Sequence, residues 1–88
     1  TETTPSPIEI SVDVQGHYYV NGVQLVNTRL KTVKQAIIDA ADGRESPHLL
    51  VNADANAPYQ SVITIMDAAS QIGFLNLSFP IRLVEEQE

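Results

Sequence analysis

The sequence predicts an α+β fold, with a small mixed sheet and two helices packed on one of its faces. Apolar and polar residues alternate in segments near both ends of the chain, apolar residues recur at helical spacing in two central segments, and an Asn-Gly pair stands close to the start. The elements are expected in the order β-β-(β)-α-β-α-β. With 88 residues, the chain is long enough for one small domain and too short for two.

The chain is expected to open with an antiparallel meander. Ile and Val alternate with polar residues in the first segment, which is the pattern of a strand with one buried face. Gln15 and Gly16 are expected to form a turn. Asn21-Gly22 is the strongest short hairpin signal, because both central residues of a type I′ turn need positive φ. The expected strands are residues 8–14, 17–20 and 23–25.

Two amphipathic helices are expected next, because apolar residues recur every three or four positions in two segments. The first helix is expected to be capped by Asn27 or Thr28 and to end before Gly43. The second is expected over residues 62–72, with Gly73 ending it.

A strand is expected after each helix. Residues 48–54 contain a near-continuous apolar run, Leu49 to Val51, which suggests a central strand buried on both faces. Residues 75–79 alternate between apolar and polar side chains, and Pro80 closes that strand.

The two ends of the chain differ from its centre in composition. Residues 1–7 carry two prolines and no apolar periodicity, so they are expected to be a disordered linker. Residues 85–88 form an acidic tail, which leaves residues 8–84 as the folded domain. The chain begins with Thr1 rather than Met, so a fragment or processed product is expected.

Charge and composition exclude several classes of function. The net charge of −6 argues against non-specific binding to nucleic acid and against docking by charge to an anionic membrane surface. The sequence contains no Cys, so disulfides, thiolate metal sites and Cys nucleophiles are excluded.

The sequence contains no recognisable catalytic or metal-binding motif. His17 and His48 have no second metal ligand at a recognised spacing. Asp54 and Asp67 offer a carboxylate pair, but Asp54 is better interpreted as a turn residue that ends a strand. A small hydrolase or isomerase using Asp54, Tyr59 and a bound water stays a minor hypothesis. We expect no enzyme and no cofactor.

One resemblance covers roughly residues 8–81. The stretches 51–59 (VNADANAPY), 62–67 (VITIMD) and 71–75 (QIGFL), with the opening hairpin 12–22 (VDVQGHYYVNG), resemble the periplasmic domain of the ExbD/TolR family of biopolymer transport proteins. Their order and spacing carry the resemblance, rather than any single motif. The Lys that follows the Asp in the family pattern is Ala55 here. The last strand is more similar to the ExbD branch than to the TolR branch.

The resemblance implies a subunit of a proton-driven motor in the inner membrane of Gram-negative bacteria. It implies a preceding membrane helix that contacts an ExbB-type subunit, a linker, and this periplasmic domain, often as a homodimer. The ExbD-like interpretation implies a TonB-type partner and outer-membrane uptake of siderophore-type cargo. The alternative is a TolR-like subunit of the Tol–Pal system, which would bind peptidoglycan.

Strand addition at a sheet edge offers a physical route to a protein partner. The last strand and the first strand, residues 8–14, are the two candidate edges, and either could instead pair with a second copy of the chain. The expected partner-binding residues are Ile8, Ile10, Val12, Asp54, Tyr59, Leu75, Asn76, Leu77, Ser78 and Phe79.

Overall fold

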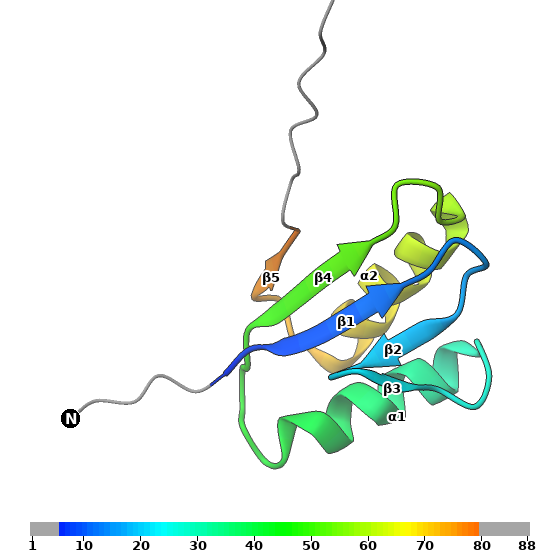
Figure 1. The fold of residues 1–88 in the computed structure, drawn as a ribbon. Coiled ribbons are helices and arrows are strands. Elements are labelled where there is room, and N and C mark those ends of the chain that lie inside the picture. Colours follow the sequence, from blue (N-terminus) through cyan, green and yellow to red (C-terminus); the bar gives the residue numbers. More distant parts are fainter. Residues whose placement is uncertain (1–5, 80–88) are drawn as a thin grey trace, which may run out of the picture.

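The computed structural model describes residues 6–79 and shows a five-stranded mixed sheet with two helices (Figure 1). The expected element order is confirmed. The acidic tail and most of the expected linker lie outside the described residues. The elements are β1 (Ile8–Val12), β2 (Tyr18–Val20), β3 (Val23–Gln24), α1 (Leu30–Ala41), β4 (Leu49–Ala53), α2 (Tyr59–Ile72) and β5 (Leu77–Ser78).

The strands are arranged in the order β3-β2-β1-β4-β5. The first three strands form the expected antiparallel meander, in which Ile10 is opposite Val20 and Val20 is opposite Val23. The helices then return the chain so that β4 runs parallel to β1, and β5 runs parallel to β4. The β1–β4 ladder extends from the Ile8–Leu49 pair to the Val12–Ala53 pair. β1 is therefore an inner strand with partners on both sides.

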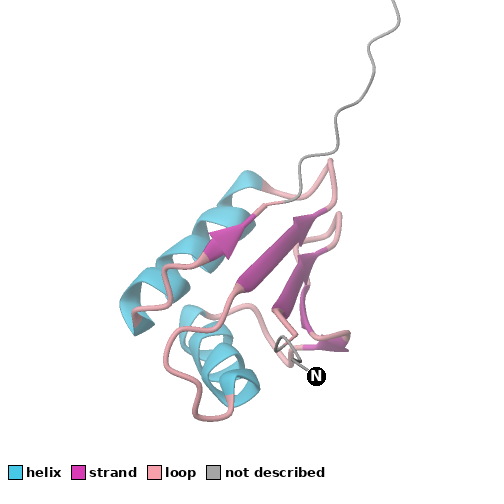
Figure 2. Ribbon diagram, turned by 90° about the vertical axis from the view of Figure 1, so that its left-hand side faces the viewer, coloured by secondary structure: helices cyan, strands magenta, loops and turns pink. Residues whose placement is uncertain are grey.

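Both helices lie on the same side of the sheet, as Figure 2 shows and as the sequence predicts. The core lies between these two layers, because alternate residues of β1 and β4 point toward the helices. α1 and α2 also pack against each other, and Lys34 Nζ donates a hydrogen bond to Gln71 Oε1 at 2.9 Å across their outer side. The fully buried large side chains are Ile8, Ile10, Ile37, Leu49, Ile65, Val33 and Val51.

The turns follow the predicted chemistry. Asn21 and Gly22 have φ values of 52° and 85°, which a type I′ hairpin requires. Gly16 has a φ of 88°, and its N–H donates to the carbonyl oxygen of Asp13 at 2.9 Å. Gly73, at 83°, ends α2 in the left-handed conformation that glycine adopts without strain.

The predicted cap of α1 is wrong. The helix begins at Leu30 with Arg29 at the N-cap, and no side chain accepts a hydrogen bond from its first turn. Asn27 Oδ1 instead accepts from the backbone N–H of Arg29, before the helix starts. At the other end, Asp42 takes the left-handed position with a φ of 50°, one residue earlier than the expected Gly43.

Candidate functional site

The β5 edge of the sheet is one candidate for binding a partner. Within residues 6–79, β5 pairs on one side only, with the first two residues of β4. The N–H of Leu49 donates to the carbonyl oxygen of Asn76 at 2.8 Å. In a parallel ladder the next bond to β5 involves Ser78, so the carbonyl of Leu77 faces the open side. Within the described part of the chain, β5 is thus an edge whose Leu77 carbonyl points away from β4.

Apolar surface flanks this edge. Leu75, just before β5, has 72% of its surface exposed, and Phe79, just after it, has 38%. His48 Nε2 lies 2.6 Å from Ser78 Oγ and ties the strand to the start of β4. Leu77 packs partly against the core. The last strand therefore lies at an edge of the sheet. This confirms one of the two candidate edges that the sequence analysis named.

The other expectation, that residues 8–14 form an edge, is wrong. β1 lies between β2 and β4, so its backbone groups are used on both sides. Ile8, Ile10 and Val12 are buried in the core at 0%, 0% and 3% exposure. Alternation of apolar and polar residues shows which face of a strand is buried, but not whether the strand lies inside the sheet or at its edge. The periodicity of residues 8–14 therefore could not show that β1 is an inner strand.

The second edge is β3, which the sequence analysis did not single out. Val23 in this strand is 67% exposed, and Val26 just after it is 90% exposed. The Asn21-Gly22 hairpin could have indicated this edge. The short strand that follows the hairpin is the last of the meander, so the meander itself provides no neighbour on its other side.

Asp54 and Tyr59 lie at the opposite end of β4 from β5. Asp54 Oδ1 accepts a hydrogen bond from the N–H of Asn56 at 2.8 Å, which is the expected turn-holding role. Tyr59 is the first residue of α2 and is 78% exposed. The structure therefore does not bring these two residues together with Leu75, Asn76 and the rest of the β5 edge.

Asp13 organises the turn between β1 and β2. Its Oδ1 accepts from the N–H groups of Gln15 and His17, at 3.0 and 2.8 Å. Its Oδ2 accepts from the hydroxyl of Tyr19 at 3.0 Å and lies 3.2 Å from His17 Nδ1. The backbone hydrogen bond from His17 is the main cause that lowers the pKa of Asp13 from 3.8 to about 2, with burial opposing it. The hydrogen bond from the Tyr19 hydroxyl to Asp13 is the main cause that raises the pKa of Tyr19.

This cluster predicts a specific loss of stability in acid. Because folding lowers the pKa of Asp13, its contribution is complete above pH 3.8 and is lost as the pH falls through about 2. We expect Asp13→Asn to reduce the slope of unfolding free energy against pH in that range. Urea unfolding followed by circular dichroism at several pH values measures it, and an unchanged slope would contradict the assignment.

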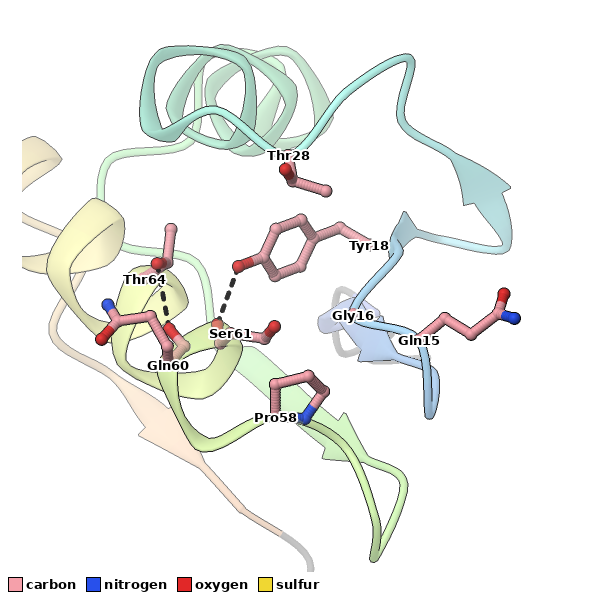
Figure 3. A pocket seen from close by; sticks show the side chains of 8 residues that line it. All are labelled: Gln15, Gly16, Tyr18, Thr28, Pro58, Gln60, Ser61 and Thr64. Carbon is pink, nitrogen blue, oxygen red and sulfur yellow. Dashed lines mark hydrogen bonds between the residues drawn. The ribbon is translucent and has the colours of Figure 1, made fainter.

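A shallow polar pocket of about 250 Å³ lies between the β1–β2 turn and the start of α2 (Figure 3). The hydroxyl of Tyr18 donates to the carbonyl oxygen of Ser61 at 3.0 Å across its floor. The added Cβ of any larger residue at Gly16 would stand 3.1 Å from Ser61 Oγ, so glycine permits this close approach. Its walls are neutral amide, hydroxyl and ring groups: Gln15, Gly16, Tyr18, Thr28, Pro58, Gln60, Ser61 and Thr64.

Neither a group of side chains suited to a metal ion nor a helix able to cross a membrane is present among residues 6–79. No group of three His, Asp or Glu side chains there could hold a metal ion. None of the helices in this part of the chain has the length and apolar character needed to cross a membrane.

Comparison with the profiles of known protein families gives a match over most of the chain. The profile of a family described as biopolymer transport protein ExbD/TolR matches residues 1–83, which include every helix and strand of the fold. No curated protein matches the chain. Proteins of the matched family are non-enzymatic transport components, which are anchored in a membrane, carry a periplasmic domain and work in complexes with other proteins. Since the match spans most of the sequence, the chain belongs to the ExbD/TolR family of biopolymer transport proteins.

Proposed function

We propose that this chain is the periplasmic domain of an ExbD-like subunit, which transmits the energy of the proton-motive force to a TonB-type partner. The β5 edge is the observation that carries the proposal, because it combines a Leu77 carbonyl that points away from β4 with exposed apolar side chains at Leu75 and Phe79. The partner would add a strand beside β5. Family membership supports the energy-transduction role.

A Pro-rich segment of a TonB-type protein suits this edge. An added strand at the end of a sheet pairs on one side only, so every second N–H of that strand points to solvent. Proline lacks the N–H and can occupy those positions without loss of a ladder bond. The apolar side chains at Leu75 and Phe79 would contact the pyrrolidine rings.

The remaining parts of the proposal concern the whole subunit. A single membrane helix before this domain would sit in the inner membrane of a Gram-negative bacterium and contact an ExbB-type subunit. The proton-carrying carboxylate would belong to that helix, so neither Asp54 nor Asp67 is assigned to it. The cargo would be of the siderophore type, and the domain would work as a homodimer.

The test is an amide NMR titration of the 88-residue chain with a Pro-rich peptide from the periplasmic region of a TonB-type protein. We expect shifts to cluster at Leu77 and Ser78. Leu75→Lys places a charge beside the edge and should weaken peptide binding about tenfold. Val23→Lys is the matched control on the β3 edge, since Val23 is 67% exposed against 72% for Leu75.

Two outcomes would reject the proposal. If no amide moves at millimolar peptide, the domain does not capture this partner by itself. If Val23→Lys weakens binding and Leu75→Lys does not, the partner binds the β3 edge instead of the β5 edge.

The TolR-like alternative, peptidoglycan binding, has one observation in its favour. The pocket that Tyr18 and Ser61 help to line offers neutral amide and hydroxyl groups, which are suited to the hydroxyl and N-acetyl groups of a glycan. Sedimentation with purified cell-wall sacculi separates the two functions. A TolR-like domain should pellet with the sacculi, whereas an ExbD-like domain should stay in solution.

A further inference from the structure

β4 extends past β5 on the outer side of the sheet (Figure 1). All five residues of β4 pair with β1, whereas within residues 6–79 the ladder between β4 and β5 consists of two pairs. The second of these pairs sets Leu50 opposite Ser78. The last three residues of β4, 51–53, therefore lie beyond the part of the strand that β5 covers.

The backbone groups at this end of β4 point to the outer side. The N–H of Asp54, just after the strand, donates to the carbonyl oxygen of Val12 in β1 at 2.9 Å. Successive residues of a strand direct their backbone groups to alternate sides, so those of Val51 and Ala53 face away from β1. Ala53 is exposed, whereas Val51 is 1% exposed. The accessible part of this edge is therefore the end of β4, at Ala53.

Residue 80 has no N–H with which to continue the ladder. After the pair of Leu50 with Ser78, the next bond to β4 would need the N–H of residue 80 to donate to the carbonyl of Val51. That residue is Pro80, which lies outside the described residues but whose missing N–H follows from the sequence. A strand with an ordinary residue at this position would make a bond with β4 that β5 does not provide.

β5 is held to the domain by few contacts. It supplies none of the large side chains that are fully buried, and Leu77 is only partly buried against the core. Besides the ladder, His48 Nε2 lies 2.6 Å from Ser78 Oγ and ties β5 to the start of β4. Short segments with few buried apolar contacts open at a lower free energy than the core does. We therefore expect β5 to leave β4 while the remainder of the domain stays folded.

We propose that the partner's strand does not stay beside β5 but replaces it on β4, in an exchange that begins at Ala53. This inference rests on the proposed function and changes one step of it, because the incoming strand belongs to the same partner. The exposed end of β4 offers the first backbone bonds while β5 is still in place. Pairing then advances to Val51 and Leu49 as β5 leaves, and the incoming strand gains a ladder along the whole of β4.

The exchange defines the chemistry of the incoming segment, which runs parallel to β4 as β5 does. Its residues opposite Leu49 and Val51 face the helix layer, where Leu77 now packs partly against the core, so they must be apolar. The residues between them face the uncovered side of the sheet and direct their N–H groups to β4. Proline is therefore accepted at the apolar positions and excluded from the positions between them.

Ser78→Ala tests the exchange, because the two modes of binding predict different results. The variant loses the hydrogen bond with His48, so β5 should leave β4 more easily. If the partner replaces β5, the Pro-rich peptide of the TonB-type protein should bind about threefold more tightly, as measured by the amide NMR titration. If the partner adds beside β5, binding should weaken or stay the same. Ser70→Ala, on the exposed side of α2, is the control and should bind as wild type does.

A disulfide that fixes β5 to β4 should block the exchange. Leu50 and Ser78 are opposite each other in neighbouring strands, whose spacing of about 4.8 Å is one that a disulfide can span. Because the chain has no Cys, Leu50→Cys with Ser78→Cys gives one defined bridge. This variant should bind the peptide about tenfold more weakly when oxidised than after reduction. The control is Glu9→Cys with Leu50→Cys, which bridges β1 to β4 and should bind equally in both states.

The outcomes separate this inference from the proposed function. Equal binding by the oxidised and reduced Leu50–Ser78 variant, or binding by Ser78→Ala that is not tighter than wild type, would overturn the exchange and leave strand addition beside β5 in place. An equal loss on oxidation of the Glu9–Leu50 control would also overturn it, because β5 is not restrained there. If the wild-type chain does not bind the peptide at all, the proposed function fails and the exchange fails with it.

Discussion

Ile37→Ala is expected to lower the free energy of unfolding by about 2–5 kcal/mol. Ile37 is 0% exposed and lies on the side of α1 that faces the sheet. Truncation removes buried methyl and methylene groups and leaves a cavity that the surrounding helices and strands fill only in part. The free energy of unfolding of a domain of this size is small, so such a loss should leave a measurable unfolded population at 37 °C. Urea unfolding followed by circular dichroism gives the change.

The next residue in the chain is the control. Ile38 is 43% exposed, so Ile38→Ala removes the same atoms from a site that is largely hydrated already. We expect a change of at most about 1 kcal/mol when the protein is dilute and monomeric. If both variants lost the same stability, the orientation of α1 in the structure would be wrong.

Tyr18→Ala is expected to cost about 3–5 kcal/mol. Tyr18 is 3% exposed, and its ring joins the meander to the first turn of α2, where the hydroxyl donates to Ser61. Its loss removes both the packing of a large ring and the floor of the polar pocket. The same urea unfolding measurement applies.

Two companion variants separate the causes. Tyr18→Phe keeps the ring and loses only the hydrogen bond, so about 0.5–1.5 kcal/mol is expected. Tyr59→Ala removes a ring that is 78% exposed and should change stability by about 0.5 kcal/mol at most. A result in which Tyr18→Phe costs as much as Tyr18→Ala would show that the hydroxyl, and not the ring, secures α2.

Local patterns in the sequence were enough to predict the elements. Alternation around Ile10 and helical spacing around Ile37 each report which side of an element is buried, because burial is periodic in a strand and in a helix. The Asn21-Gly22 turn was predictable because few residues accept positive φ. These signals depend on near neighbours in the chain, so no tertiary information was needed.

The order of strands in the sheet could not be predicted in the same way. Whether residues 8–14 form an inner strand depends on β4 returning parallel to them, and that pairing joins residues about forty positions apart. The α1 cap failed for a related reason. Asn27 can accept a hydrogen bond from several nearby N–H groups, and the loop that leads to Leu30 determines which one it meets. The family resemblance did not supply the strand order either, because it left residues 8–14 as one of two candidate edges.

The parallel course of β1, β4 and β5 determines how the domain would resist a pull. Tension applied between Pro7 and a segment held at the end of β5 runs along the strands, so it loads the hydrogen bonds of each ladder together, in shear. Among residues 6–79, five residue pairs join β1 to β4 and two join β4 to β5. The β4–β5 ladder is therefore the mechanical weak link, and it would yield while the hydrophobic core behind β1 stays intact.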